Sequence, residues 1–194
     1  MIRVVIVDDH PALRAGLRAV LDAEPGIVFA GESAGDEEGL WPVINRSRPD
    51  LVLLDYHLPR SDGMQICYRI KHEVLAPKVI IFSAYASPSL ALPATLAQAD
   101  GLLAKDVGAR DLFHGIRAVY GGERLVPPIS AAVLEDAYAR LAPEHHAMVG
   151  MLLDRTNDTD IAETLGIERR EVRHAVHRML HLLRLDIPAA SVTG

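Results

Sequence analysis

The sequence predicts an α/β fold: a five-stranded parallel sheet covered by helices, followed by a small all-α domain. Three observations support this prediction. Short apolar runs rich in β-branched residues or leucine recur through the first 120 residues, stretches with helical spacing separate them, and only helical patterns follow residue 128. Because strands that alternate with helices are joined by right-handed crossovers, the strands are expected to run parallel.

Five runs have the length of a strand and an almost continuous apolar character, as expected of strands that helices cover on both faces. They are residues 4–7, 27–30, 51–54, 79–82 and 101–104. Helical spacing is clearest at Leu13, Leu17 and Leu21 before the second run and at Leu112 and Ile116 after the fifth. Strand and helix therefore alternate five times along the chain.

The alternation stops at residues 121–128, whose sequence is GGERLVPP. Two glycines and two prolines disfavour both a continued helix and a central strand, so we place the domain junction here. Helical patterns follow at residues 129–141, 143–153, 158–165 and 169–183. The predicted organisation is a domain at 1–121, a linker with a helix at 122–140, a helical domain at 141–187 and a tail at 188–194. Since most of the linker is helical, we expect the two domains to pack together.

At 194 residues, of which 49% are hydrophobic, the chain can bury one core plus a small helical module. Its formal net charge of -6 argues against an overall basic surface that coats nucleic acid or an anionic membrane, although a local basic face is allowed. Cys67 is the only cysteine, which excludes an intrachain disulfide and a cysteine-rich zinc site and fits a reducing compartment. The first apolar run meets two carboxylates at once, unlike a signal peptide or membrane span, so we expect a cytoplasmic protein without membrane contact.

Carboxylates directly follow two of the expected strands: Asp8 and Asp9 follow the first, and Asp55 follows the third. If the strand order is 2-1-3-4-5, these strands are neighbours, and the three side chains converge at the carboxyl edge of the sheet, where α/β proteins bind ligands. Such crowding of negative charge is unfavourable without a cation. Oxygen ligands favour a hard ion that keeps several waters, so we expect Mg²⁺, with Mn²⁺ as the alternative and the backbone carbonyl of His57 as a further ligand.

A hydroxyl and an ammonium group are expected at the same edge, because Ser83 ends the fourth run and Lys105 follows the fifth. Together with the carboxylates they suit transfer of a phosphoryl group to a carboxylate. Asp55 is then the nucleophile, the metal ion offsets charge on the phosphoryl oxygens, and Ser83 and Lys105 bind the other oxygens. The alternative for any one residue is structural, because Asp at a strand end often caps the next helix and Lys usually lies in solvent. All five residues in register favour the functional interpretation.

The motifs around these residues are DDH at 8–10, LVLLDYHLPRSDG at 51–63, FSA at 82–84 and LLAKD at 102–106. In their joint spacing they resemble the receiver domain of two-component systems, which has a flavodoxin-like fold, and the resemblance covers residues 1–121. It implies that Asp55 accepts a phosphoryl group from a sensor histidine kinase and that Asp8 and Asp9 bind the metal ion. It also implies that Ser83 is the switch hydroxyl and Lys105 the lysine of the family. The residues that match the loop after the acceptor are Pro59 and Gly63.

One departure from the family's pattern concerns the switch. Receivers commonly carry Tyr or Phe where this chain has Leu102, and that ring turns inward when the hydroxyl residue engages the phosphate. We expect Leu102 to repack instead, with Tyr85 as a substitute aromatic. His10 and His57 are interpreted as side chains at the edge of the pocket that tune access to Asp55, in preference to a metal or phosphohistidine site.

The last predicted helix is amphipathic and follows a tight turn at Gly166, which has no side chain to oppose a positive φ. Basic side chains share the face opposite its apolar residues: Arg169, Arg170, Arg173, His174, His177, Arg178 and His181. An exposed basic helix after a helical turn suits the major groove of DNA, where guanidinium groups contact phosphates and guanine edges. The alternative is an ordinary solvated face of a helical bundle.

Residues 141–185 resemble the LuxR-type helix-turn-helix that follows receivers in the NarL/FixJ family. This resemblance implies DNA binding, and Arg173 matches the family's basic residue after the valine. Several positions depart from the pattern: Glu171 stands where the family usually has Thr, Ala175 where it often has His, and Ala142 and Glu144 replace the usual Thr and Arg. An acidic Glu171 would face DNA phosphates unfavourably unless it is paired with Arg.

The first hypothesis is a transcriptional regulator in which phosphorylation of Asp55 favours a homodimer that binds a two-fold symmetric, palindromic DNA site. Such a protein catalyses only its own phosphorylation and dephosphorylation and is not otherwise an enzyme. The second hypothesis is a protein-interaction module whose helix-turn-helix does not bind DNA; Leu102, Glu171 and the acidic helical domain favour it. A third, a metal-dependent phosphohydrolase, is disfavoured because its nucleophile would end the first strand in a D-x-D pattern, whereas this chain reads DDH.

Overall fold

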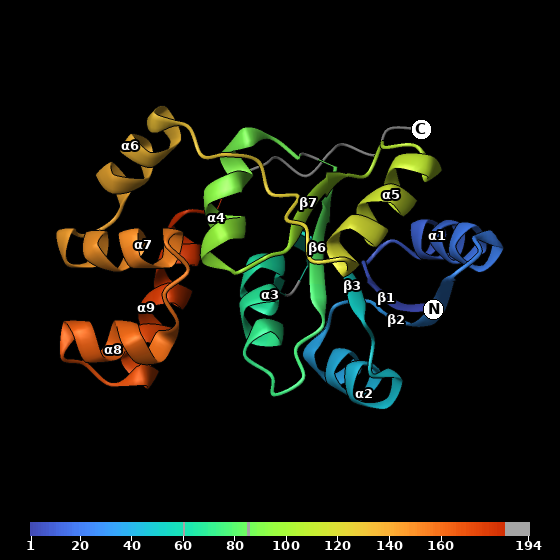
Figure 1. Ribbon diagram of the computed structural model, residues 1–194, viewed down its shortest axis with the longest axis horizontal. Coiled ribbons are helices and arrows are strands. Elements are labelled where there is room, and N and C mark those ends of the chain that lie inside the picture. Colours follow the sequence, from blue (N-terminus) through green and yellow to red (C-terminus); the bar gives the residue numbers. More distant parts are fainter. Residues whose placement is uncertain (60, 85, 185–194) are drawn as a thin grey trace.

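A parallel five-stranded sheet forms the centre of the computed structural model, which describes residues 1–59, 61–84 and 86–184 apart from the side chain of Glu37 (Figure 1). The strands lie in the order β2-β1-β3-β6-β7. Their bounds are β1 Ile2–Val7, β2 Ile27–Ser33, β3 Leu51–Asp55, β6 Lys78–Ser83 and β7 Gly101–Ala104. When the five strands of this sheet are numbered in chain order, with β6 as the fourth and β7 as the fifth, their order is 2-1-3-4-5, as predicted. Each predicted apolar run lies inside one observed strand.

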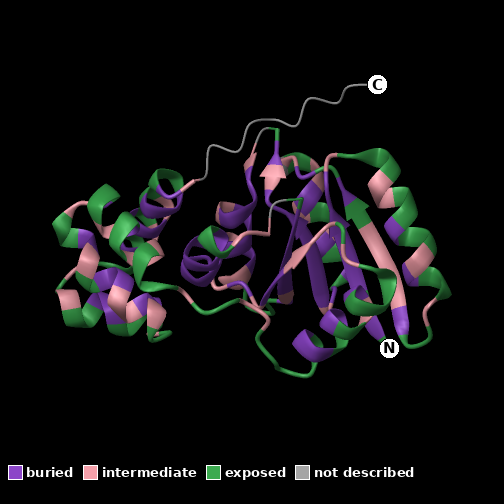
Figure 2. Ribbon diagram, turned by 90° about the horizontal axis from the view of Figure 1, so that it is seen from above, coloured by how far each residue is buried: buried purple, intermediate pink, exposed green. Residues whose placement is uncertain are grey.

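Helices bury both faces of the sheet (Figure 2). Their bounds are α1 Pro11–Ala23, α2 Glu37–Ser47, α3 Gly63–Lys71, α4 Ala91–Leu96 and α5 Ala109–Tyr120. Successive residues of a strand point to opposite faces, so Val4 and Ile6 of β1 pack with α1 and α5, whereas Val5 and Val7 pack with α2, α3 and α4. Burial on both faces explains why the strands have continuous apolar sequences.

The chain after the sheet domain is helical. Its elements are α6 Ala131–Arg140, η2 Pro143–His145, α7 His146–Leu153, α8 Asp158–Leu165 and α9 Arg169–Leu182. α8 has the predicted bounds, and Gly166 ends it with a φ of 67°, as the predicted turn requires. The predicted helix at 143–153 is divided into a 3-10 turn and an α-helix. The last predicted residues of the helical domain and the tail at 188–194 lie outside the described residues.

The helical part packs against α3 and α4, on the side of the sheet away from α1 and α5 (Figure 1). All six residues of α4, which follows the 3-10 turn η1 Pro88–Leu90, are buried, because the sheet lies on one side of this helix and α7 and α9 contact the other. One cluster of buried side chains continues from Val52 of the sheet through Leu92 of α4 to Val149 and Val176. The two parts therefore share an apolar core, as the short linker predicts. Within the described part of the chain, no helix is both long and apolar enough to span a membrane.

Candidate functional site

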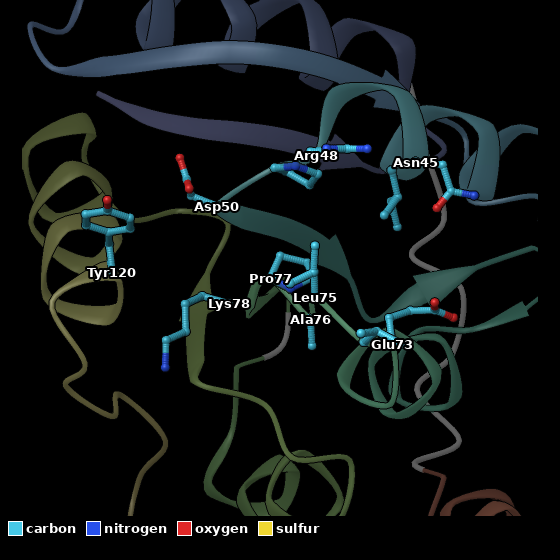
Figure 3. Close-up of a pocket in the computed structure, with 12 residues that line it drawn as sticks. Asn45, Arg48, Asp50, Glu73, Leu75, Ala76, Pro77, Lys78 and Tyr120 are labelled. Atoms are coloured by element: carbon cyan, nitrogen blue, oxygen red, sulfur yellow. The ribbon is translucent and has the colours of Figure 1, made fainter.

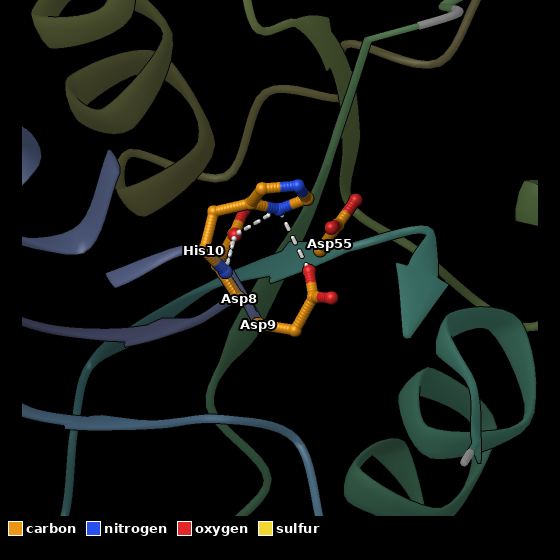
Figure 4. Close-up of side chains that lie close together, drawn as sticks. All are labelled: Asp8, Asp9, His10 and Asp55. Carbon is orange, nitrogen blue, oxygen red and sulfur yellow. Dashed lines mark hydrogen bonds and ion pairs between the residues drawn. The ribbon is translucent and has the colours of Figure 1, made fainter. Parts of the chain in front are cut away.

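The predicted carboxylates meet at the carboxyl edge of the sheet (Figure 4). β1 and β3 are neighbours, and Val7 of β1 pairs with Leu54 of β3. Asp8, the residue after β1, therefore lies beside Asp55, the last residue of β3. Asp8 is 1% exposed and Asp55 is 2% exposed. One ligand atom from each of these residues, from Asp9 and from His10 lies within 4.8 Å of the others. The predicted convergence of three acids is thus confirmed.

Lys105 is the counter-ion of this cluster. Its Nζ lies 2.6 Å from Oδ2 of Asp8 and 2.7 Å from Oδ2 of Asp55. Its backbone N–H donates to the carbonyl of Ser83 at 2.9 Å, which anchors the end of β7 to the end of β6. The predicted placement of an ammonium beside the acids is therefore confirmed, with a single lysine serving two buried carboxylates.

The charge balance of the cluster is uneven and shifts the pKa values of its members. Burial raises the pKa of Asp55; the hydrogen bond and charge of Lys105 lower it, but burial and the charge of Asp8 together prevail, so the pKa stays above its usual value. Burial lowers the pKa of Lys105, but the two carboxylates outweigh it and raise that pKa. The ammonium is therefore held in its charged form, while negative charge on the acids is left only partly neutralised.

The carboxylate oxygens have unused capacity for a cation. Beyond their ion pairs with Lys105, Oδ2 of Asp8 and Oδ2 of Asp55 accept no hydrogen bond from the described residues. Oδ1 of Asp9 has His10 Nδ1 at 2.7 Å and no hydrogen-bond partner besides it in that part of the chain. Buried, all-oxygen donors of this kind fit a hard divalent ion. His10 contacts the acids from the pocket edge, as predicted for this residue.

The turn after Asp55 brings its backbone close to the start of α3. The N–H of His57 donates to Oδ1 of Asp55 at 3.1 Å. The antiparallel pair β4 His57–Leu58 and β5 Ser61–Asp62 closes the turn, and Asp62 caps α3 by accepting from the N–H of Met64 at 2.8 Å. This pair and this cap were not anticipated from the sequence, although Ser-Asp-Gly before a helix is a typical N-cap signal.

Gly63 is required by this close approach, because a Cβ at that position would lie 2.2 Å from the carbonyl oxygen of Asp55. Gly63→Ala is expected to lower the free energy of unfolding by about 3 kcal/mol, since backbone on both sides would have to move. Gly16→Ala is the control: Gly16 lies inside α1 with no atom near an added Cβ, so this change is expected to stabilise the chain by about 0.5–1 kcal/mol. Urea denaturation measures both, and equal effects would contradict the steric argument.

The predicted switch residues lie on the neighbouring strands. Ser83 ends β6 and is 2% exposed. The residue before it, Phe82, pairs with Asp55 in the sheet. Leu102 is buried in the core between the sheet and α4, with 6% exposure. Tyr85, the predicted substitute aromatic, lies outside the described residues.

Contacts with α8 and with α3 divide the predicted basic face of α9. Five of its seven members are exposed: Arg169, Arg170, His174, Arg178 and His181. The other two from the predicted contact set are partly buried, which corrects the prediction of one solvent-facing surface. Nε of Arg173 lies 3.4 Å from Oδ2 of Asp158, and the ring of His177 meets Tyr68 of α3 edge-on at 5.6 Å between centroids. Burial, then the charges of Arg69 and His174, lower the pKa of His177.

A polar cluster that was not predicted joins the two parts at this point. Asp158 of α8 is 4% exposed and accepts hydrogen bonds from the hydroxyl of Tyr68 at 3.2 Å to both oxygens, and His72 Nε2 lies 2.8 Å from Oδ2. Burial alone would raise the pKa of Asp158, but His72, Tyr68 and Arg173 outweigh burial and lower it. Burial and the nearby charge of Asp158 raise the pKa of Tyr68. Nothing in the separate motifs indicates that α3 and α8 meet, so sequence reasoning missed this cluster.

Glu171 has a structural partner. Its Oε2 accepts from the backbone N–H of Glu168 at 2.8 Å, and the side chain of Glu168 accepts from the backbone at Glu171, which completes a capping box at the start of α9. The acidic residue that departs from the family's pattern therefore stabilises the beginning of the helix.

A cavity of about 720 Å³ lies at the end of the sheet opposite the acidic cluster (Figure 3). Asp50, which precedes β3, and Lys78, which begins β6, line it together with Leu75 and Tyr120. These are the amino ends of the strands, whereas the acidic cluster is at the carboxyl ends. This cavity therefore contributes nothing to the acidic site.

Comparison with known proteins agrees with this geometry. The family model of the response regulator receiver domain matches residues 4–117. The DNA-binding transcriptional activator DevR/DosR of Mycobacterium tuberculosis is 28% identical over 96% of this chain and 90% of that protein. The nitrate/nitrite response regulator protein NarL of Escherichia coli is 26% identical over 94% of this chain and 89% of that protein.

The crystal structure of a LuxR-family two-component response regulator from Aurantimonas sp. SI85-9A1 is also similar. The two sequences are 29% identical, and the structures superpose with a TM-score of 0.61. The match covers 71% of this chain and 99% of the Aurantimonas chain. The family match spans the sheet domain that carries the acidic cluster, and the matches to full-length regulators continue through the helical part. The chain belongs to the response regulator receiver domain family and is a two-component response regulator of the NarL/FixJ type.

Proposed function

We propose that this response regulator accepts a phosphoryl group on Asp55 from a sensor histidine kinase and controls transcription through α9. The observation that carries the proposal is the ion pair of Lys105 with both Asp8 and Asp55 at the carboxyl edge of the sheet. That arrangement places a buried carboxylate nucleophile beside a cation that can bind phosphoryl oxygens. A role in the cytoplasm, close to the kinase's catalytic domain, follows from this proposal.

The acidic cluster suits Mg²⁺, with Mn²⁺ as the alternative, held by Asp8, Asp9, Asp55 and the backbone carbonyl of His57. When bound, the ion neutralises charge on the phosphoryl oxygens. An oxygen of Asp55 forms a bond to phosphorus while the phosphorus–nitrogen bond of the donor phosphohistidine breaks, and the freed imidazole takes up a proton. Lys105 and the hydroxyl of Ser83 hold the transferred oxygens. We propose no other enzymatic reaction than this self-phosphorylation and the hydrolysis that reverses it.

The helical part, 141–187 after a linker at 122–140, is proposed to bind DNA through Arg169, Arg170, Arg173, His174, His177 and Arg178. In the arrangement described above, Arg173 pairs with Asp158 of α8 and His177 contacts Tyr68 of α3. Arg173 must therefore leave Asp158, and α9 must separate from α3, before both can contact DNA. We propose that phosphorylation of the 1–121 domain favours this separation, with Leu102 repacking beside Ser83, and favours a homodimer on a palindromic site. DevR/DosR is described as DNA-binding, which supports the proposal.

A salt titration of DNA binding tests this proposal. The chain phosphorylated with acetyl phosphate is titrated with mixed-sequence duplex DNA, and its affinity is expected to fall steeply with salt because phosphate contacts release counter-ions. Arg173→Gln is expected to weaken binding roughly tenfold and to reduce the salt slope by about one. Arg18→Gln, on exposed α1, is the control and leaves both unchanged.

The alternative is a protein-interaction module that does not bind DNA. The acidic capping box at Glu168 and Glu171, at the start of the helix that would enter the major groove, favours it. If the phosphorylated chain does not bind DNA at low salt, this alternative is supported and the proposal that the protein regulates transcription by binding DNA is refuted.

A further inference from the structure

A second cavity, of about 190 Å³, lies where the receiver part meets the helical part. It is lined by residues of α3 and α4, of the loop before β7, of the segment after α5, of α7 and of the turn between α7 and α8. These are Lys71, Thr95, Gln98, Asp100, Arg124, Leu152, Arg155, Thr156 and Asn157. Asp100 precedes β7 whereas Lys105 follows it, so this cavity lies at the opposite end of that strand from the acidic cluster.

Positive charge predominates in this cavity. Lys71, Arg124 and Arg155 line it, against a single acid, Asp100. That acid is already used: it lies 2.8 Å from Nζ of Lys71 and 3.1 Å from Nζ of Lys78, and it accepts from the N–H of Val79. Within the described residues, neither arginine of the cavity makes an ion pair. Two unneutralised guanidinium groups therefore face one cavity.

The two arginines come from different parts of the molecule. Arg124 follows α5 and donates to the hydroxyl of Thr95 at 2.7 Å, which holds its guanidinium at the cavity. Arg155 lies in the turn before α8. Burial, and then the charge of Arg155, lower the pKa of Arg124. Their like charges repel across the junction of the two parts. The charge of Asp100 opposes this effect on Arg124, but burial and Arg155 outweigh it.

The backbone at the cavity is unusual as well. Gln98 has a φ of 61° and Arg155 a φ of 59°, two of the three non-glycine residues with positive φ in the described part of the chain. Each lies just after a helix, α4 or α7, where glycine would adopt the same conformation at lower cost. At both positions the chain instead places a long polar side chain that lines the cavity. Backbone strain of this kind often accompanies ligand sites.

We propose that this cavity binds a phosphate-sized oxyanion that bridges Arg124 and Arg155 and holds the helical part against the receiver part. The anion would neutralise the two guanidinium groups in the bidentate manner that arginine favours with phosphate and sulfate. The cavity is smaller than those that hold drug-sized molecules, which selects a small anion. The side-chain amide of Gln98 supplies a neutral hydrogen-bond donor beside the arginines. The hydroxyl of Thr95 donates to the carbonyl of Ala91 and accepts from Arg124, so its role is to position that guanidinium.

Equilibrium dialysis of the full chain with radiolabelled orthophosphate tests the proposal. EDTA is present to remove divalent ions from the acidic cluster. Wild type is expected to bind one phosphate saturably, and Arg155→Gln to bind it at least tenfold more weakly. Arg110→Gln, at the exposed start of α5, is the matched control and keeps wild-type affinity. Absence of saturable binding to wild type, or unchanged binding to Arg155→Gln, would overturn the proposal.

Two further variants separate this cavity from the acidic cluster and from a folding defect. Lys105→Met is expected to retain phosphate binding; loss of binding in this variant would assign the anion to the Asp55 site and overturn the proposal. Arg155 is exposed, and its side chain makes no hydrogen bond or ion pair with the described residues, so its replacement tests the cavity even if Arg124→Gln does not fold. Phosphate should also raise the melting temperature above that in chloride at equal ionic strength, in wild type but not in Arg155→Gln. An equal rise of the melting temperature in both proteins would contradict the proposal that phosphate binds at Arg155.

Discussion

Asp55→Asn is expected to abolish phosphorylation by acetyl phosphate, because the amide cannot form the acyl phosphate that a carboxylate oxygen forms. Intact-mass spectrometry of the chain after incubation with Mg²⁺ and acetyl phosphate measures the product. The expected loss is complete, larger than 100-fold in initial rate. Asp106→Asn is the matched control, since Asp106 is an exposed acid next to Lys105 at the same edge of the sheet. A variant Asp55→Asn that still gains one phosphoryl group would refute Asp55 as the acceptor.

The same substitution is expected to stabilise the fold at neutral pH. The folded-state pKa of Asp55 lies above its ordinary value of 3.8, so the ionised carboxylate costs the folded state free energy at pH above that value. This cost disappears as pH falls and the carboxylate is protonated in both states. The free energy of unfolding of Asp55→Asn should therefore exceed that of wild type at pH 7, with a difference that shrinks as pH falls toward 4. A lower stability at pH 7 would contradict the raised pKa.

Asp158→Asn is expected to separate the two parts of the molecule and to raise DNA affinity without phosphorylation. Asp158 is buried and holds Tyr68 of α3 and His72, which follows that helix, together with Arg173 of α9. Removing one member of a buried ionic cluster leaves the others without a partner and costs roughly 3 kcal/mol. Because Arg173 would then lose its ion pair with Asp158 and His177 would be free of α3, unphosphorylated Asp158→Asn should bind mixed-sequence DNA roughly tenfold more tightly than wild type.

Small-angle scattering and limited proteolysis at residues 121–128 report the separation directly. Glu163→Gln is the matched control, because Glu163 is an exposed acid on the same helix and its loss changes the net charge equally. The folded-state pKa of Asp158 is below 3.8, so its contribution to docking is present at pH above that value and is lost as pH falls below it. If Asp158→Asn remained compact and bound DNA as wild type does, this cluster would not be what holds α9 in place.

The fold and the acidic site were predictable from the sequence for a physical reason. Strands buried on both faces need continuous apolar runs, and residues that follow parallel strands must emerge at one edge of the sheet. Asp8, Asp55 and Lys105 could therefore be placed at one edge from their positions after the runs, and the strand order 2-1-3-4-5 brings them together there. The ends of elements were less certain, since β2 extends to Ser33, three residues beyond its apolar run, where backbone pairing with β1 continues.

The faces of α9 could not be assigned in the same way. Periodicity shows which residues share a face, but the surface that covers that face depends on contacts between segments about 90 residues apart, such as Tyr68 with Asp158. The local pattern at Arg173 and His177 is the same whether they face solvent or, as here, Asp158 of α8 and Tyr68 of α3.

The amino-acid sequence by itself determined the positions of the five strands, the edge at which the acids and the lysine emerge, and the helical C-terminal part, because these depend on local hydrophobic patterning and on the geometry common to parallel sheets. Only the tertiary structure decided that α4 is buried between the two parts, that Asp158 joins α3 to α9 and that Arg124 and Arg155 share a cavity. These features arise where surfaces from distant segments meet, and the free energy of such contacts depends on shape and charge that no single segment contains.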